Sequence, residues 1–341
     1  MVRCDGGPDV GLGHVVRCLA LADALRDAHG CRVRFLVRKG PVAKSIILKA
    51  GYLVSEPADG LDEETWIRQV IERECPAALL MDFRAGLSPL AVERWRRRGI
   101  LMISIDDPEY KRVACDLLFF PPIPQVDYLD WSGFTGELYV GWEWVVLREQ
   151  FGTIGRVRKV NSQPLVLVTM GGSDPEGLTL KAVKALDSMH DAFNVVVILG
   201  AAFCHKQKLQ EILSRTRRGF EVRSNVTNMA EVMAETDLAV ASFAVTAYEL
   251  AAMRVPGVYL CLSEDHALSA SAFSKAGIAL VLGVFATVTQ QALADGIRYL
   301  LNDSAARCTM AQRCAELVDG RGAQRTAQVI AKRLQARNAK T

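Results

Sequence analysis

The chain has 341 residues, of which 50% are hydrophobic and 23% charged, with 41 Lys and Arg against 38 Asp and Glu and a formal net charge of +3. This composition is typical of a globular protein and excludes collagen-like, disordered and low-complexity chains. At roughly 100 to 200 residues per domain, the length predicts two domains. Because the basic and acidic residues nearly cancel, we expect small-molecule partners and no broad electrostatic surface for nucleic acid.

The cysteine pattern and the apolar stretches indicate the compartment. Nine cysteines are scattered without a CxxC pair, no signal peptide is recognisable before them, and their odd number leaves no complete disulfide pairing. We therefore expect a reducing cytoplasm. The longest apolar stretches, 250–262 and 277–288, are interrupted or short, whereas a membrane-spanning helix needs about 20 apolar residues, so none is expected. No spacing of ligand residues indicates a metal, and no cofactor is predicted.

Alternating strands and helices in the first half predict a parallel sheet covered on both faces. A strand at Val2–Cys4 leads into a Gly-rich turn at 5–13 and a helix at 14–28 whose apolar residues share one face. This strand is shorter than the usual about five residues, which is what a truncated or misplaced start would give. The next predicted elements are a strand at 32–38, a helix at 42–50 and strands at 77–81 and 100–105.

The periodicity fades at 121–163, where prolines and a basic run at 156–159 indicate a linker. A second series then predicts strands at 165–169, 194–199, 221–223, 238–241 and 257–261, and helices at 178–189, 207–214, 229–235, 246–253 and 267–276. The fold class is therefore α/β, with two doubly wound, Rossmann-like domains facing a cleft and ligands at the carboxyl ends of the strands. We place the N-terminal domain at 1–150, the C-terminal domain at 163–325, and a C-terminal helix and tail at 326–341.

The first Gly-rich loop carries Gly11, Gly13 and His14 directly before a helix. Val16 stands where GxGxxG needs its third glycine, and no GxxxxGK[ST] run occurs, so dinucleotide and P-loop sites lose support. Near the positive end of the helix dipole the protonated imidazole is disfavoured, which would leave His14 as a base for water or a hydroxyl. Alternatively, His14 only caps or packs the helix.

A second loop, Gly171, Gly172, Ser173 and Asp174, joins a strand to a helix. Glycines let the backbone approach an anion, and a helix N-terminus supplies amide donors, so this loop is a candidate phosphate site. The alternative is ordinary turn chemistry, with Asp174 as the N-cap and Pro175 as the first helical residue.

Two later strand-to-helix loops carry the remaining candidates. Thr246 and Glu249, after Ser242, fit a capping box. Alternatively, Glu249 accepts hydrogen bonds from ribose hydroxyls while the loop holds a diphosphate. Asp265 and His266 precede another helix, where Asp265 also fits a cap. The remaining histidines that we considered lack ligand-like neighbours and are predicted to lie on the surface: His29, His190 and His205.

Several segments carry a family resemblance in chain order: Arg3-Cys4-Asp5, Gly11-Leu12-Gly13-His14-Val15-Val16-Arg17-Cys18-Leu19-Ala20-Leu21-Ala22, Asp106-Asp107, Gly141 with Leu147-Arg148-Glu149-Gln150-Phe151, Gly171-Gly172-Ser173-Asp174-Pro175, Tyr248-Glu249-Leu250 and Val255-Pro256. The chain resembles the nucleotide-sugar hydrolases of nonulosonic acid synthesis and the related SpsG proteins of spore coat polysaccharide synthesis. That family is similar to the GT-B glycosyltransferases, including the UDP-GlcNAc transferase of peptidoglycan synthesis, so the resemblance implies a GT-B-like fold.

The resemblance also implies an activity. The family releases UDP from UDP-2,4-diacetamido-2,4,6-trideoxy-β-L-altrose on the route to pseudaminic acid, in a metal-independent, inverting attack of water on the anomeric carbon. It implies that His14 is the catalytic residue and that the nucleotide lies near Gly172, Ser173 and Glu249. The full set of predicted substrate-binding residues is Asp5, Gly13, Arg17, Gly171, Gly172, Ser173, Asp174, Ser242, Thr246, Glu249, Asp265 and His266.

The chain departs from the family at two places. Asp265-His266 stand where the family has Asn-Gln, and Asp82-Phe83-Arg84 stand where it has Asp-His-Tyr. Exchanging amides for a carboxylate and an imidazole changes the hydrogen-bond pattern, which fits a different sugar or a lost activity.

Two alternatives therefore stay open beside a cytoplasmic, monomeric UDP-sugar hydrolase. One is a glycosyltransferase, because water and an acceptor hydroxyl need similar base chemistry, and an apolar or basic patch on the N-terminal domain would favour it. The other is a nucleotide-sugar binding protein without turnover.

Overall fold

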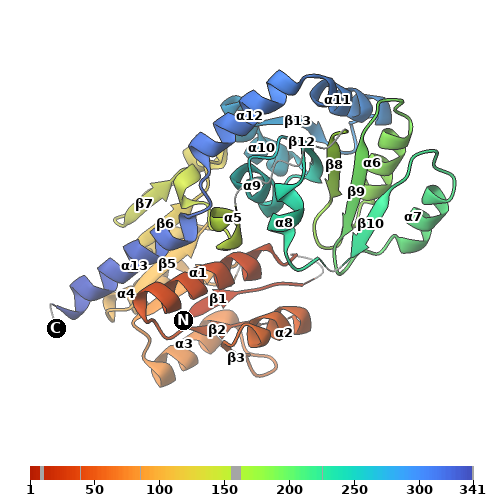
Figure 1. Cartoon of the computed structure of the whole chain (residues 1–341). Helices are drawn as coiled ribbons and strands as arrows, with labels where there is room; N and C mark the ends of the chain where they lie inside the picture. The colour runs from red at the N-terminus through yellow and green to blue at the C-terminus, as the bar shows by residue number, and fades with distance from the viewer. Residues whose placement is uncertain (8–10, 39, 85, 155–162, 225, 340–341) are drawn as a thin grey trace. The chain divides into compact units, whose positions relative to one another are not determined.

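A computed structural model describes residues 1–7, 11–38, 40–84, 86–154, 163–224 and 226–339 (Figure 1). The chain forms two compact units: unit 1 comprises Met1–Glu149 and Arg321–Thr341, and unit 2 comprises Gln150–Gly320. Each unit is built on one parallel sheet, with seven strands in unit 1 and six in unit 2. The predicted α/β class with two parallel, helix-covered sheets is confirmed.

The sheet of unit 1 has the order β3-β2-β1-β4-β5-β6-β7. Its strands are β1 (Val2–Cys4), β2 (Arg34–Leu36), β3 (Leu53–Ser55), β4 (Ala78–Asp82), β5 (Leu101–Ile105), β6 (Leu117–Phe120) and β7 (Glu137–Val140). Every residue of β5 and β6 is buried, as expected for parallel strands covered on both faces. The strand order reverses between β1 and β4, and ligands of doubly wound sheets bind at the carboxyl ends of strands at such a point.

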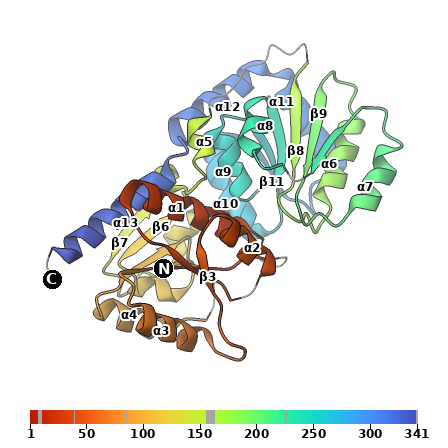
Figure 2. The ribbon, with the colours of Figure 1, turned by 60° about the horizontal axis from the view of Figure 1, so that its bottom comes forward.

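Helices cover both faces of this sheet (Figure 2): α1 (Gly13–His29), α2 (Pro41–Lys49), α3 (Glu63–Glu74), α4 (Pro89–Arg97) and α13 (Gly322–Asn338). On one face α1, α2 and α13 share an apolar cluster with the strands, and α13 lies along α1. On the other face, Trp66 of α3 and Trp95 of α4 are buried in a second cluster. The Asp62 and Ser88 side chains cap α3 and α4, which fixes where these helices begin.

Unit 2 has the strand order β10-β9-β8-β11-β12-β13, which reverses between β8 and β11. Its strands are β8 (Leu165–Thr169), β9 (Asn194–Leu199), β10 (Glu221–Ser224), β11 (Leu238–Ser242), β12 (Gly257–Cys261) and β13 (Ala279–Val284). Its helices are α5 (Gln150–Thr153), α6 (Leu178–Asp187), α7 (Lys206–Leu213), α8 (Met229–Ala234), α9 (Val245–Ala252), α10 (Glu264–Ala276), α11 (Gln290–Asn302) and α12 (Ser304–Leu317). An apolar cluster packs α6 and α11 against the strands.

The elements differ from the sequence predictions at the middle and at the end of the chain. The linker predicted at 121–163 is wrong for Glu137–Val140, which pairs with β6 as the edge strand β7. Three of the four β7 residues are exposed, so no buried run marked this strand in the sequence. The basic run at 156–159 lies outside the described residues. The boundary placed at 325 falls inside α13, which completes unit 1.

A buried ionic network joins β1 to α3. Arg3 is almost fully buried, and its Nε donates to Glu63 Oε1 at 2.6 Å. Its two terminal nitrogens each donate to Asp5, both at 2.7 Å. Arg38 Nε also donates to Glu63, at 2.6 Å. Since a buried charge is costly unless it is paired, Glu63 and Asp5 together compensate the burial of the Arg3 charge.

Glu63→Ala is therefore expected to destabilise unit 1 by about 3 kcal/mol, because it leaves Arg3 with part of its charge unpaired. All five tryptophans lie in unit 1, so tryptophan fluorescence during urea unfolding reports on this unit alone. The control is Glu72→Ala on the same helix, where the carboxylate is exposed and 3.7 Å from Arg68; it should cost less than about 0.5 kcal/mol. Equal midpoints for the two variants would contradict the role given to Glu63.

Candidate functional site

A histidine and an aspartate meet at the strand-order reversal of unit 1. His14 lies in the first turn of α1, which follows β1, and Asp82 is the last residue of β4. His14 Nδ1 is 2.6 Å from Asp82 Oδ1, with the His14 side chain 21% exposed and the Asp82 side chain 1% exposed. Because an ionised carboxylate only accepts hydrogen bonds, Nδ1 carries a proton, and in the neutral form of the imidazole the lone pair is on Nε2. This geometry suits a general base.

Arg17, one helical turn after His14, holds the same carboxylate. Its Nε and Nη2 donate to the two Asp82 oxygens, each at 2.6 Å, and the Cys18 thiol lies 3.4 Å from Oδ2. Burial raises the pKa of Asp82, but the Arg17 guanidinium and His14 outweigh burial and hold that pKa well below its usual range. Asp82 is therefore ionised at neutral pH, which keeps the imidazole in one orientation.

The end of β5 joins this cluster. Arg17 Nη1 donates to Asp106 Oδ2 at 3.0 Å. Asp106 has φ +51°, a left-handed conformation that is uncommon outside glycine and is often found where function constrains the backbone. Arg84 Nη1 donates to the Asp106 carbonyl at 2.6 Å. The carboxyl ends of β4 and β5 are thereby tied to the start of α1.

A buried lysine fixes the loop after β4. Lys111 Nζ donates to the carbonyl oxygens of Phe83 at 3.1 Å and Arg84 at 2.7 Å, and to Asp107 Oδ1 at 3.0 Å. Both charged partners, Lys111 and Asp107, are almost fully buried. The backbone that carries Arg84 is therefore held from inside the unit.

Two of the residues predicted to bind substrate, Asp5 and Gly13, have roles in the fold of unit 1. The Asp5 carboxylate accepts from Arg3 and from the Arg38 backbone N–H, so it belongs to the buried network that contains Glu63. Gly13 is the first residue of α1, after Leu12 at the N-cap. His14 is therefore not the cap of this helix, and the capping alternative for His14 is wrong.

In unit 2, the loops that follow β8, β9 and β11 come together at the strand-order reversal. Ala202 N donates to the Gly172 carbonyl at 3.0 Å. A Cβ placed on Gly200 would lie 2.4 Å from the Gly171 oxygen and 2.3 Å from the Gly172 oxygen, so only glycine fits there. A Cβ on Gly171 would lie 3.8 Å from Ser242 Oγ. The predicted residues of both loops are thus neighbours.

Asp174 uses its carboxylate inside the protein. Oδ1 accepts from Leu178 N at 2.7 Å, and Oδ2 accepts from Thr179 N at 2.9 Å. Helix α6 begins at Leu178 after Gly177, so Pro175 is not its first residue and Asp174 is not its N-cap residue, although its side chain serves that end of the helix. The carboxylate already occupies the anion position of α6, because it takes amide donors of the first turn.

Helix α9 has a different N-terminus. Its N-cap residue is Ala244, which has no side-chain oxygen to accept from the first turn. Thr246 lies inside the helix, so the predicted capping box with Glu249 is wrong. Thr246 is half-buried, Glu249 is buried, and Ser242 ends β11 directly before this turn. No described side chain caps the first turn, although Ala247 N donates to the Ala244 carbonyl at 2.9 Å. A first turn without a side-chain cap is what an anion site requires.

Helix α10 begins after Ser263, whose Oγ accepts from His266 N at 3.2 Å. Ser263 is the cap, so the expectation that Asp265 caps this helix is wrong, and both Asp265 and His266 lie in the first turn. The Nδ1 atom of His266 is buried without a hydrogen-bond partner among the described residues.

His205, directly before α7, was predicted to lie on the surface. Its Nε2 atom lies 2.9 Å from the Pro175 carbonyl, so His205 is half-buried against the loop that contains Gly171–Asp174 and Pro175.

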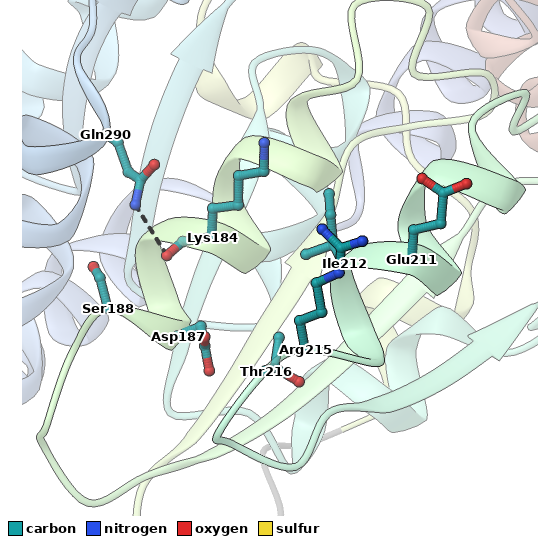
Figure 3. Close-up of a pocket in the computed structure, with 8 residues that line it drawn as sticks. All are labelled: Lys184, Asp187, Ser188, Glu211, Ile212, Arg215, Thr216 and Gln290. Carbon is teal, nitrogen blue, oxygen red and sulfur yellow. Dashed lines mark hydrogen bonds between the residues drawn. The ribbon is translucent and has the colours of Figure 1, made fainter.

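A pocket of about 450 Å³ in unit 2 contains none of the predicted residues (Figure 3). It lies between the C-terminal parts of α6 and α7, where the Gln290 amide donates to the Lys184 carbonyl at 3.2 Å. Its lining residues are Lys184, Asp187, Ser188, Glu211, Ile212, Arg215, Thr216 and Gln290. Helix α6 runs away from the Gly171–Asp174 loop, so this pocket is separate from the loop cluster.

Sequence reasoning left out Asp82, Arg84, Asp106 and Gly200 as site residues. The available signal was their position, since each stands at the end of an apolar strand, or one or two residues beyond it, in a parallel sheet. Among the described residues, no group of three or more His, Cys, Asp or Glu side chains is placed to hold a metal ion.

Comparison with known proteins identifies first the class of fold. No family model matches the chain. The fold matches MurG of Acinetobacter baumannii with a TM-score of 0.72, at 16% identity over 97% of this chain and 99% of that one. It also matches the spinosyn rhamnosyltransferase SpnG with thymidine diphosphate (TM-score 0.65, 14% identity, 96% and 99% covered) and MnaA of S. aureus with UDP (0.66, 14%, 98% and 96%). The fold is GT-B-like.

The sequence then points to a particular relative. The chain is SpsG-like: it is 21% identical to the spore coat polysaccharide biosynthesis protein SpsG of Bacillus subtilis, over 96% of both chains. It is also 27% identical, over 76% of its length, to an uncharacterized protein of Methanocaldococcus jannaschii. It covers 55% of that protein, little more than half its length. No described helix is both long and apolar enough to cross a membrane.

Asp82→Asn is expected to lower the free energy of unfolding of unit 1 by about 3 kcal/mol at neutral pH, because Arg17 loses its buried partner. The low pKa of Asp82 means that its ionisation stabilises the folded state fully above about pH 4 and that this contribution is lost as the pH falls further. Urea unfolding followed by tryptophan fluorescence should therefore show a gap in unfolding free energy between wild type and variant that is constant from about pH 7 to about pH 5 and narrows as the pH falls below about 4. A gap independent of pH would refute the assignment.

Gly200→Ala is expected to destabilise unit 2 by about 1–3 kcal/mol, because the methyl group must displace the Gly171–Gly172 backbone. The matched control is Gly219→Ala in the same unit, where an added Cβ meets nothing within 4 Å and which should be close to neutral. Thermal unfolding followed by circular dichroism measures both. A Gly200→Ala protein as stable as the control would show that the two loops are not in contact.

Proposed function

We propose that this protein hydrolyses a UDP-sugar at the anomeric carbon and releases UDP, in the synthesis of a surface polysaccharide or a nonulosonic acid. The observation that carries the proposal is the His14–Asp82 pair at the strand-order reversal of unit 1. Three further facts support it: the GT-B-like fold, the likeness to a protein named for spore coat polysaccharide biosynthesis, and fold neighbours that hold UDP or thymidine diphosphate.

In the proposed reaction, His14 Nε2 takes a proton from a water molecule while the water oxygen bonds to the sugar C1. The bond between C1 and the phosphate oxygen breaks, and UDP leaves with the electron pair. Asp82 stays ionised and stabilises the imidazolium that forms, and Arg17 keeps the carboxylate in place. The proton then passes from His14 to solvent. Attack on the face opposite UDP inverts the configuration at C1.

We assign the nucleotide to unit 2. The first turn of α9, with Ser242 and Thr246, would receive the diphosphate, because no side chain in the described part of the chain caps this end of the helix. Gly171, Gly172 and Ser173 border this turn, and Glu249 would accept from the ribose hydroxyls. Asp174 is left out of this assignment, since its carboxylate caps α6. Asp265 and His266, in the first turn of α10, complete the proposed set.

The proposal also extends to the identity of the sugar and of the group that attacks it. The sequence resemblance favours a 2,4-diacetamido-2,4,6-trideoxyhexose and the pseudaminic acid route. We also propose a cytoplasmic monomer that needs no cofactor. Phe83 and Arg84 depart from that family at the site itself. A glycosyltransferase would use the same base on an acceptor hydroxyl instead of water, and the likeness of the fold to the rhamnosyltransferase SpnG supports this second candidate.

The test is release of nucleoside diphosphate from a panel of UDP- and CDP-sugars without acceptor, followed by phosphorus NMR. We expect release from a UDP-sugar, and His14→Ala should lower kcat by about 100-fold or more because the base is lost. His29→Ala, which removes an exposed histidine at the other end of the same helix, is the matched control and should retain activity.

Binding of UDP-sugars without release would reject the hydrolase for those sugars. Release that appears only after an acceptor is added would identify a transferase. Equal rates for wild type and His14→Ala would remove His14 from the catalytic role.

A further inference from the structure

The loop after β4 carries a cation that the proposed reaction does not use. The Arg84 side chain is 46% exposed, next to the buried Arg17–Asp82 pair. The Arg17 side chain is fully paired within the protein, because its three nitrogens donate to Asp82 and Asp106. Arg84 makes one hydrogen bond to the described residues, through Nη1 to the Asp106 carbonyl, while Nη2 is 4.0 Å from the Asp106 carboxylate.

Hydrogen bonds to both the backbone and the side chain of Arg84 hold this residue in place. Its carbonyl accepts from buried Lys111 at 2.7 Å, and its guanidinium is anchored at one nitrogen by Asp106. One edge of the guanidinium is thereby fixed, while the side chain as a whole is half-exposed and makes no second hydrogen bond to the described residues. A planar guanidinium with free donors matches the two oxygens of a carboxylate, with which it forms paired charge-assisted hydrogen bonds.

Resting on the proposed hydrolysis of a UDP-sugar, we propose that Arg84 is a specificity-determining residue and that the sugar carries a carboxylate, as in a uronic acid, in place of the 6-deoxy sugar that the family resemblance implies. Asp106 links Arg84 to Arg17, and Asp82 links Arg17 to His14, so the cation belongs to the cluster that contains the base. Since the proposed function gives the diphosphate to the amide donors of α9, the anion proposed for this cation is a carboxylate on the sugar.

The experiment compares matched pairs of nucleotide sugars that differ only at C6: UDP-glucose with UDP-glucuronate, and UDP-GlcNAc with its uronic acid counterpart. Isothermal calorimetry measures binding, and phosphorus NMR measures release, with UDP alone as a third ligand. The variants are Arg84→Gln, which removes the charge, and Arg84→Lys, which keeps it. Arg94→Gln, an exposed arginine on α4 of the same unit, is the matched control. Thermal unfolding of each variant checks that it folds.

We expect the wild type and Arg94→Gln to bind the acidic member of a pair about tenfold or more tightly than the neutral one, the size of a charge-assisted hydrogen-bonded pair. Arg84→Gln should abolish that ratio with UDP affinity unchanged, and Arg84→Lys should keep part of it. A purely structural Arg84 would lower the unfolding temperature and leave the ratio intact.

The outcomes separate this inference from the proposed function. Tighter binding of the acidic sugars without any release supports the specificity role and rejects hydrolysis. Release with no acidic preference, or with a preference that survives in Arg84→Gln, overturns the inference and leaves hydrolysis standing. A loss of UDP affinity in Arg84→Gln equal to the loss for the nucleotide sugars overturns it as well, because the cation would then hold the diphosphate.

Discussion

The ionised carboxylate of Asp82 is the constraint on which the candidate site depends. It is buried at the end of β4, where an unpaired charge would be costly, and three side chains of α1 repay that cost: His14, Arg17 and Cys18. The same contacts tie the start of α1 to the end of β4 and set the tautomer of His14. Stability of unit 1 and readiness of the base are therefore two results of one interaction.

The two units place chemistry by the same topological rule but with different groups. In each, the candidate loops follow the central strands where the strand order reverses. Unit 1 supplies side-chain charges there, while unit 2 supplies backbone amides and small residues such as Gly172 and Ser242. A nucleotide sugar has a matching division, since its diphosphate is recognised by amide donors and its anomeric carbon needs a base.

Much of this arrangement could be predicted from local sequence. Strand-loop-helix order identified the loops at Gly171 and Ser242, because apolar runs and glycines are local signals. The partners of His14 could not be found in this way, since Asp82 lies 68 residues away and the contact depends on which strands are neighbours. Capping was the least predictable feature. Thr246 and Glu249 have the right spacing, but α9 begins one residue before Thr246, and spacing alone does not say where a helix begins.

Helix α13 has a consequence for how the chain is made. Unit 1 is discontinuous: its first segment ends at Glu149, and its last, which contains α13, begins at Arg321. The apolar face of α1 packs against Ala323, Ala327 and Ile330 of α13. During synthesis this contact forms only after all of unit 2 has left the ribosome. Unit 2 has no such dependence, because its ends meet each other, with the Gly152 and Gly320 backbones in contact. The half of the protein that emerges first is thus the half that is completed last.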